Sequence, residues 1–231
     1  MKLQLGVTTE HSCSYLDDQS AREAVLMPEN TTAAIYQLLI DQGFRRSGDH
    51  LYRPYCQLCT ACQSLRVDVQ NFKPTRSQRR VIHKNTDITW NEKKCLTLKH
   101  YQLYCEYQSA RHHGGTMEHQ SYEEFCQFLN CSWAPIRILE GYLDTELIIV
   151  SIIDLFDQGA SAVYTFFSPQ YAARSLGKTT IIQQINWLRQ ANKNWLYLGY
   201  QIDPCPKMNY KNEFSPHQRF INNHWDFEKA E

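Results

Sequence analysis

Apolar residues recur at helical spacing in four stretches of the chain, at residues 30–43, 96–110, 121–129 and 176–191. The first begins with Asn30, a residue of capping type, and ends at Gly43, which is suited to a helix C-terminus. The third opens with the pattern Ser121-x-x-Glu124, which predicts a capping box. We therefore expect four helices. On the first of them, the side chains expected to face the core are Ala34, Ile35, Leu38 and Leu39.

Stretches rich in β-branched and aromatic residues predict strands. Residues 140–153 and 160–167 fit two antiparallel strands separated by a turn at residues 157–159, and residues 195–200 fit another strand. The second half thus has the order strand, strand, helix, strand. This order predicts an α+β fold class, with a mixed sheet flanked by helices.

The first half carries weaker signals. Residues 44–55 predict a short hairpin around Ser47-Gly48-Asp49, and residues 65–69 alternate between apolar and polar as a strand does. Residues 111–115 predict a loop between two helices. No repeat and no Gly/Ser or Pro linker interrupts the 231 residues, which suits one large domain or two small, interlocked ones.

Composition excludes several classes of protein. With 24 Lys+Arg, 24 Asp+Glu and 42% hydrophobic residues, the chain is neither disordered nor a polybasic DNA binder. No window approaches the roughly 18 to 20 apolar residues that span a bilayer, and the first ten residues lack the apolar core of a signal peptide. We expect a cytoplasmic protein without membrane or DNA partners.

The charge is nevertheless segregated. Residues 66–94 contain eight basic residues against three acidic ones. Such a run is commonly a solvated face, but Phe72 and the apolar pair Val81-Ile82 predict that part of it is anchored with its arginines aimed in one direction. Arginine grips carboxylates and phosphates bidentately. One cationic patch on a neutral protein is suited to a local polyanion, such as the acceptor stem of an RNA.

Nine cysteines include one cluster, Cys56-x-x-Cys59-x-x-Cys62. With Cys13 as a fourth ligand, it would suit tetrahedral zinc or an iron-sulfur cluster. There is no second CxxC and no well-spaced histidine pair. The alternative is a tight turn that packs small thiols beneath the basic segment.

Residues 200–216 form a segment that leaves a predicted strand, contains three prolines and carries Lys, Tyr, Asp and Glu among apolar residues. It predicts a shaped functional loop; aromatic packing plus a surface hairpin is the alternative. The chain has no Ser-His-Asp motif, no Walker loop and no HExxH, so no motif supports a hydrolase or a kinase activity.

Seven motifs in order resemble the aminoacyl-tRNA protein transferase family, and within it the bacterial aspartate/glutamate leucyltransferases. The resemblance runs from about residue 10 to about residue 225. The motifs are Cys13-Ser-Tyr-Leu16, Tyr52-Arg-Pro-x-Cys56-x-x-Cys59-x-Ala-Cys62, Arg66-Val67, Phe72-x-Pro-x-Arg-Ser-Gln-Arg-Arg80, Ala162-Val-Tyr-Thr-Phe-Phe-Ser-Pro169, Arg174-Ser-Leu-Gly177 and Gly199-Tyr-x-Ile-x-x-Cys-x-Lys-Met-x-Tyr-Lys211.

The resemblance implies an enzyme that moves leucine from Leu-tRNA to the α-amine of proteins beginning with Asp or Glu, which marks them for degradation as an N-degron. It implies a transferase region at residues 1–94 and an acetyltransferase-like (GNAT) domain at residues 95–231. No cofactor is required for transfer. Eukaryotic members carry a CxxC where this chain has Cys13-Ser-Tyr-Leu16, so a metal cluster of their kind would lack a ligand unless residues 56–62 compensate.

Acyl transfer from an ester to an amine needs orientation, a donor for the oxyanion and an acceptor for the amine proton. Backbone N–H groups at residues 175–178 could serve as the donor. As catalytic residues we expect Tyr164, Asp203, Lys207 and Tyr210, with Glu213 as a second proton acceptor. The acidic chain end and the tRNA would be bound by Arg66, Arg76, Arg79, Arg80, Arg174, Gly177 and Lys211. Lys207 is an alternative to the arginines for gripping the acidic end.

Three alternatives stay open from the sequence: arginine as the donated residue, a GNAT-like acyltransferase that uses acyl-CoA, and a non-catalytic RNA-binding module. Against acyl-CoA, Arg174-x-x-Gly177-x-Thr179 only partly matches the pyrophosphate loop of that fold.

Overall fold

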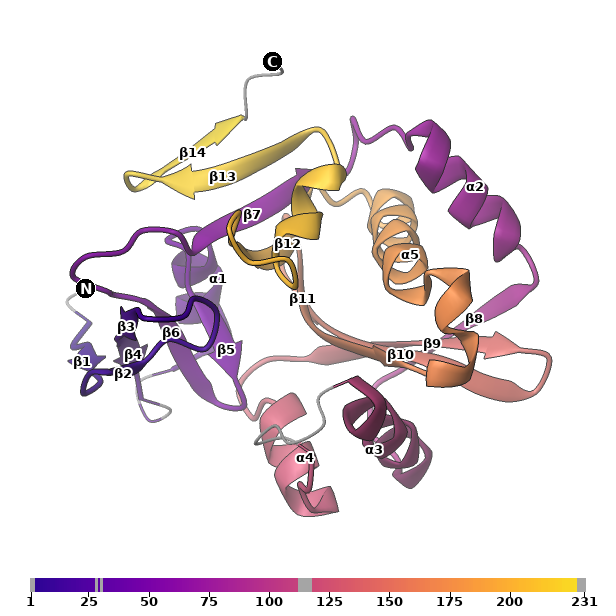
Figure 1. Ribbon diagram of the computed structural model, residues 1–231, viewed down its shortest axis with the longest axis horizontal. Helices are drawn as coiled ribbons and strands as arrows, with labels where there is room; N and C mark the ends of the chain where they lie inside the picture. Colours follow the sequence, from indigo (N-terminus) through magenta and orange to yellow (C-terminus); the bar gives the residue numbers. More distant parts are fainter. Residues whose placement is uncertain (1–2, 28, 30, 112–117, 228–231) are drawn as a thin grey trace.

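The computed structural model describes residues 3–27, 29, 31–111 and 118–227 (Figure 1). Asn30 and residues 112–115 of the expected loop lie outside the described residues. The helices are α1 (Ala33–Ile40), α2 (Arg76–Lys84), α3 (Leu98–Arg111), α4 (Tyr122–Leu129) and α5 (Leu176–Gln190), with the 3₁₀ helices η2 (Pro169–Arg174) and η3 (Asn209–Glu213).

An eight-stranded sheet forms the centre of the molecule. Its order is β14-β13-β7-β12-β11-β10-β9-β8, and every pair is antiparallel except β11 and β12. The strands are β7 (Gln63–Asp68), β8 (Ile88–Lys93), β9 (Ile136–Leu143), β10 (Glu146–Leu155), β11 (Gly159–Phe167), β12 (Trp195–Gln201), β13 (His217–Ile221) and β14 (His224–Phe227). The structure therefore confirms the α+β class with a large mixed sheet flanked by helices.

Helices cover both faces of this sheet (Figure 1). On one face, α5 packs Ile185 and Leu188 against Leu65 and Leu196, and α2 lies beside α5. On the other face, α3 and α4 bury an aromatic cluster against β9, β10 and β11. The three helices predicted at residues 96–110, 121–129 and 176–191 thus bury their apolar faces against the two faces of one sheet.

A four-stranded sheet with the order β1-β4-β6-β5 lies at the N-terminal side with α1. Its strands are β1 (Gly6–Val7), β4 (Glu23–Leu26), β5 (Arg45–Ser47) and β6 (His50–Pro54), and β2 (His11–Ser12) pairs separately with β3 (Ser20–Ala21). The predicted hairpin at residues 44–55 is confirmed as β5 and β6. The capping box at Ser121 and Glu124 is also confirmed.

Two expectations were wrong. Residues 140–153 do not form one strand, because a turn with Asp144 in the left-handed region (φ 52°) separates β9 from β10. Ala34 and Leu38 were expected in the core but are exposed, Leu38 by 63%, since α1 buries the face that carries Tyr36, Leu39 and Ile40.

The strands β7 and β8 precede residue 95, yet they lie in the same sheet as the strands of the second half. The division at residues 94 and 95 stays a prediction. Over the part of the chain that the structure describes, no helix has the length and apolar character required to cross a membrane.

Candidate active site and thiol pocket

Strands β11 and β12 pair over only three residues, from Gly159 opposite Trp195 to Ser161 opposite Tyr197, and then separate. Arg45, from β5, enters the place where they part. Its Nη1 donates to Ser161 Oγ at 2.7 Å and to Tyr197 O at 3.3 Å, and its Nη2 donates to Ala162 O. The side chain is therefore held by both parting strands and is buried.

Gly199 makes room for this arginine. It has a φ of 83° at a bulge in β12, and a Cβ there would lie 3.5 Å from the Arg45 guanidinium carbon. A positive φ is strained for residues with a side chain. The glycine of the Gly199-Tyr200 motif thus serves the local backbone and the packing of Arg45.

Lys211, in η3, is the second buried cation of this region. Only 4% of the residue is exposed, and its Nζ donates to Met208 O at 3.2 Å and lies 4.9 Å from the centre of the Tyr210 ring. No carboxylate among the described residues pairs with it. Burial, and next the positive charge of Arg45, lower the pKa of Lys211 to about 8.

Tyr210 lies against Lys211, and Tyr164 lies on β11, one of the strands that hold Arg45. Tyr164 on β11 accepts a hydrogen bond from Gln108 Nε2 at 2.9 Å, and burial raises the pKa of Tyr164 to about 12. The Tyr107 hydroxyl acts electrostatically on both Tyr164 and Tyr210 and, after burial, raises the pKa of each. The Oε1 of the fully buried Gln108 has no hydrogen-bond partner within the described part of the chain. These residues supply hydroxyl donors, two buried cations and a hydrogen-bond acceptor that is unused within the described residues.

The predicted proton acceptors are already engaged. Asp203 accepts from Arg219 Nη1 at 2.6 Å, and this hydrogen bond lowers the pKa of the carboxyl. Glu213 pairs with Lys178 at 2.5 Å. Lys207 is exposed. A carboxylate that is held ionised by a cation is a weak base, so the geometry favours Lys211 over these three for proton transfer.

Arg66 also has a structural task. Its guanidinium lies 4.0 Å from the ring centre of Trp195 and 4.3 Å from that of Trp225, and it pairs with Asp41 at 2.9 Å. Its Nε donates to Gln218 at 2.8 Å. With its charge and donors used in this way, Arg66 is not available to grip an acidic substrate.

Arg174 is engaged in the same manner, by Asn85 Oδ1 at 3.0 Å, Lys84 O at 2.9 Å and the carboxylate of Asp87. It holds the loop before β8 against η2. Gly177 is the second residue of α5, beside Phe167. The N-cap residue of α5 is Ser175, whose side chain makes no cap hydrogen bond to the first-turn N–H groups of residues 175–178 that the sequence predicts as oxyanion donors.

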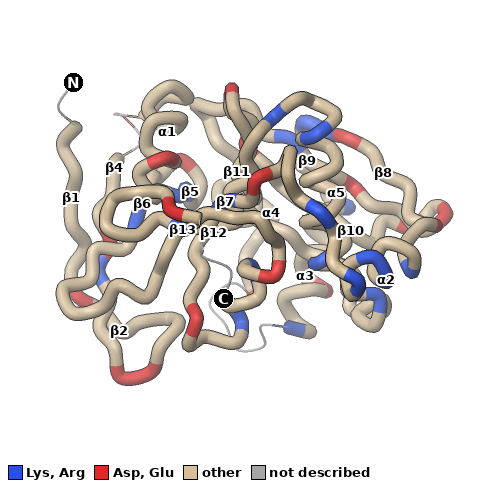
Figure 2. The backbone as a smooth tube through the Cα atoms, turned by 90° about the horizontal axis from the view of Figure 1, so that it is seen from above, with Lys and Arg blue, Asp and Glu red and all other residues tan. Residues whose placement is uncertain are grey.

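Helix α2 carries the basic segment. Thr75 and Gln78 form a capping box at its start, and Gln78 Nε2 donates to Glu213 O of η3 at 3.0 Å. The N-terminal end of α2 is thus tied to the loop that contains Lys211. Figure 2 shows the basic residues gathered along α2. An open groove of about 500 Å³ is lined by Arg76, Arg79, Arg80, His83 and Lys84, all of them exposed.

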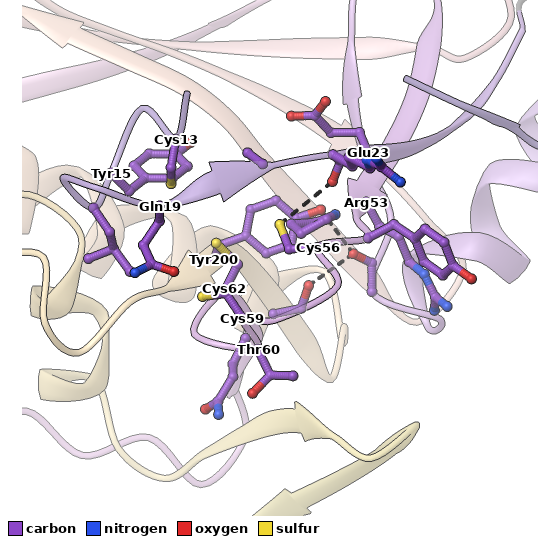
Figure 3. A pocket seen from close by; sticks show the side chains of 18 of the residues that line it. Cys13, Tyr15, Gln19, Glu23, Arg53, Cys56, Cys59, Thr60, Cys62 and Tyr200 are labelled. Atoms are coloured by element: carbon purple, nitrogen blue, oxygen red, sulfur yellow. Dashed lines mark hydrogen bonds between the residues drawn. The ribbon is translucent and has the colours of Figure 1, made fainter. Parts of the chain in front are cut away.

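The four predicted metal ligands, Cys13, Cys56, Cys59 and Cys62, line one pocket of about 340 Å³ (Figure 3). Burial raises the pKa of the Cys62 thiol to about 12. The described residues nevertheless contain no group of three or more Cys, His, Asp or Glu side chains placed to hold a metal ion. As they lie, the thiols do not fit a tetrahedral site, and no step of the reaction is assigned to a metal.

Arg45, Gln108 and Arg53 were not predicted as site residues from the sequence. Arg45 follows Gly43 in the predicted hairpin, but nothing local signals that it reaches the second half of the chain. Gln108 lies in a helix that was predicted from its apolar positions, and no local pattern marks this polar residue as a site residue. Arg53 falls inside a quoted motif and lines the thiol pocket.

Known proteins resemble this chain over nearly its whole length. The family model described as "Arginine-tRNA-protein transferase, N terminus" matches residues 11–80, and the one described as "Arginine-tRNA-protein transferase, C terminus" matches residues 99–221. An aspartate/glutamate leucyltransferase of Vibrio campbellii is 43% identical over 96% of both chains. One of Aeromonas salmonicida is 42% identical over 96% of this chain and 94% of its own.

Among solved structures, the L-PGS structure from Bacillus licheniformis matches with a TM-score of 0.47 at 15% identity. The match covers 73% of this chain and 52% of that one, so this chain spans about half the length of that protein.

Proposed function

The chain belongs to the arginine-tRNA-protein transferase family, and on this basis we propose that it moves leucine from Leu-tRNA to the α-amine of proteins that begin with Asp or Glu. The observation that carries the proposal is the 43% identity over 96% of both chains to a relative named aspartate/glutamate leucyltransferase. The product would carry an N-terminal leucine in front of the acidic residue. Such an end would mark the protein for degradation.

The reaction joins the acceptor amine to the leucyl carbonyl carbon and breaks the ester bond to the tRNA. The amine loses a proton and the tRNA oxygen gains one. Because an α-amine has a pKa of about 7.7 to 8.0, part of it is neutral near pH 7 and no strong base is needed. A group that carries the proton from nitrogen to oxygen is needed, and its pKa should lie near the working pH.

Lys211 fits that task. It is buried, its pKa is about 8, and it pairs with no carboxylate of the described residues that would hold it protonated. Neutral Lys211 would take the proton from the attacking amine and return it to the leaving oxygen. The hydroxyls of Tyr164 and Tyr210, which stay protonated because burial raises their pKa values, would donate to the oxyanion.

The donor would enter where β11 and β12 part. A parallel strand pair that separates after three residues, joined by α5, supports an acetyltransferase-like (GNAT) arrangement of this half. The unused Oε1 of Gln108 would accept from the amino group of the leucyl ester. A buried acceptor without a partner costs free energy, which a ligand donor would restore.

The phosphates of the tRNA would lie along α2, whose N-terminal end meets η3. We expect the double variant Arg76→Ala/Arg80→Ala to raise the KM for Leu-tRNA about tenfold or more, with kcat at saturating tRNA nearly unchanged. Each lost phosphate contact should lower the slope of log affinity against log salt by about 1. The measurement is initial-rate kinetics with varied Leu-tRNA at several salt concentrations.

The matched control for that variant is Lys99→Ala, which removes an exposed cation from α3. Its KM for Leu-tRNA should stay within about twofold of the unchanged protein. Equal KM values and salt slopes for the double variant and the unchanged protein would remove α2 from the tRNA site.

The activity itself is tested by incubation with labelled Leu-tRNA, Arg-tRNA or acetyl-CoA and a peptide that begins with Asp. We expect leucine alone to reach the peptide amine. Transfer of arginine would change the donor, transfer of acetyl would make the chain an acyl-CoA enzyme, and transfer of neither aminoacyl group would refute the proposed function.

A further inference from the structure

Among the described residues, the thiol pocket contains one charge without a partner of opposite charge. Four of the residues that line it are charged or titratable at neutral pH: His11, Arg22, Glu23 and Arg53. Arg22 pairs with Glu10 at 3.2 Å, and His11 lies 3.6 Å from Glu23, whose other oxygen accepts from Thr8 at 3.1 Å. Arg53 pairs with no carboxylate among the described residues.

Arg53 is held in place while most of its donors stay free. It lies at the end of β6, its Nη1 donates to Gln42 O at 2.9 Å, and its guanidinium lies 5.3 Å from the ring centre of Phe44. Among the described residues, the guanidinium makes this one hydrogen bond and this one ring contact. Four of its five N–H groups are therefore left for a ligand. Because the side chain is half-buried, a bound anion would be less screened than on an open surface.

The pocket adjoins the centre of the candidate active site. Tyr200 of β12 lines it, and the Tyr200 hydroxyl donates to Gly43 O at 3.1 Å, next to Gln42. Tyr200 also packs in a cluster with Met208, whose carbonyl oxygen accepts a hydrogen bond from Lys211. The charge of Arg45 acts on both Tyr200 and Tyr52. Figure 3 shows Tyr200 and the thiol loop between Arg53 and Cys13.

We propose that this pocket binds the N-terminal residue of the acceptor protein and that Arg53 grips its side-chain carboxylate. The inference rests on the proposed function and names the residue that sets the preference for an acidic end. A volume of about 340 Å³ suits one residue better than a nucleotide stretch. A single guanidinium with a free fork matches one planar carboxylate, whereas the row of exposed cations on α2 suits successive phosphates.

The same geometry accounts for the rejection of Asn and Gln. An amide would present its NH₂ group to the guanidinium and would lose one of two charge-assisted hydrogen bonds as well as the net charge. A site built around a specific polar partner discriminates strongly against analogues that lack it. Arg53 therefore acts on specificity through the acceptor, without contact to the leucyl ester.

The test uses the full chain, Leu-tRNA and four peptides that differ only in their first residue, Asp, Asn, Glu or Gln. For Arg53→Gln we expect kcat/KM with the Asp peptide to fall about 10²-fold, so that the Asp to Asn ratio drops to within a few-fold of one. The KM for Leu-tRNA should not change. Arg53→Glu should prefer a peptide that begins with Lys over one that begins with Asp.

The matched control is Arg137→Gln, which removes a half-buried arginine of β9 that pairs with Glu92 at 2.9 Å and does not line the thiol pocket. Its Asp to Asn ratio should stay within about threefold of the unchanged protein. Because Arg53→Gln could disturb β6, Arg53→Lys and a circular dichroism melt accompany it; the lysine should keep part of the acidic preference.

An unchanged Asp to Asn ratio in folded Arg53→Gln, with leucine still transferred, would overturn the inference and leave the proposed function intact. A raised KM for Leu-tRNA with an unchanged ratio would assign the pocket to the tRNA and overturn it equally. Absence of leucine transfer by the unchanged protein would be the failure of the proposed function instead.

Discussion

The variant Lys211→Met should lose leucine transfer by about 10²- to 10⁴-fold in kcat/KM, the range that a positioned proton carrier contributes. Methionine matches the length of the lysine stem and removes only the ammonium. Since Lys211 is buried without a carboxylate partner among the described residues, its replacement breaks no ion pair, and the fold should persist. The measurement is single-turnover transfer from Leu-tRNA to an Asp peptide, with a thermal melt for folding.

The pH dependence tests the role of Lys211 directly. Transfer needs the acceptor amine neutral, with a pKa of about 7.7 to 8.0, and Lys211 neutral, with a pKa of about 8. Below both values log kcat/KM should therefore rise with pH at a slope of about 2 and level off above pH 8. In Lys211→Met only the amine titrates, so the slope should fall to about 1.

The matched control is Lys193→Met, a half-buried lysine in the turn after α5 whose Nζ donates to Asp157 O at 2.8 Å, and it should keep the full rate and the slope of about 2. A bell-shaped profile, with the rate falling above pH 8, would mean that Lys211 acts as a cation. A rate for Lys211→Met within threefold of the unchanged protein would exclude it from the chemistry.

Local signals in the sequence predicted local structure well. Helical spacing located α3, α4 and α5, and the Ser121 to Glu124 pattern marked the start of α4, because these features depend on residues three or four apart. The same kind of signal was overlooked at Thr75-x-x-Gln78. Helix α2 buries Gln78 but exposes Ile82, so it has little apolar face to detect.

The candidate site could not be predicted in the same way. Arg45 lies 116 residues from its partner Ser161, and its position depends on how far β11 and β12 pair. Whether an arginine is free is likewise a tertiary property. By residue type, Arg66 and Arg53 could each bind a carboxylate. In the fold, Arg66 stacks on Trp195 and pairs with Asp41, whereas Arg53 makes one hydrogen bond among the described residues, to Gln42 O, and keeps its other N–H groups for a ligand.

The motif that ends at Lys211 brings together residues whose surroundings in the fold differ. The motif that ends at Lys211 includes Asp203, Lys207 and Tyr210, and all were expected to act in catalysis. In the fold these residues have different environments. Lys211 is buried, Lys207 is exposed, and Asp203 accepts a hydrogen bond from Arg219. Burial decides which of several titratable residues can carry a proton, and burial is set by the packing of η3 against β12.

A buried ion pair joins the two sheets, and removal of one of its partners should cost much stability. Arg46 donates from Nε and Nη2 to the two oxygens of Asp154 at 2.7 and 2.8 Å, with both side chains fully buried. Its Nη2 also donates to Leu129 O at the end of α4. Tyr36 donates to Asp154 Oδ2 at 3.1 Å. The pair thus fixes β5, and with it the neighbouring Arg45, to the strand β10.

Asp154→Ala should therefore lower the free energy of unfolding by about 3 to 5 kcal/mol, because it leaves a buried guanidinium without its counter-charge. Urea unfolding followed by circular dichroism measures this loss. The matched control is Glu10→Ala, which breaks the more exposed pair with Arg22 and should cost less than about 1 kcal/mol.

The double variant Arg46→Met/Asp154→Leu distinguishes the contribution of the two charges from the contribution of side-chain packing. It removes both charges, so it should be destabilised by less than the two single variants added together. Its leucine transfer should still fall, because Arg45 would lose the neighbour that fixes β5 against β10 while keeping its own bonds to Ser161 and Tyr197. Additive losses in the double variant would show that the two charges do not interact in the folded protein. Full activity in a folded double variant would show that Arg45 is positioned by β11 and β12 alone.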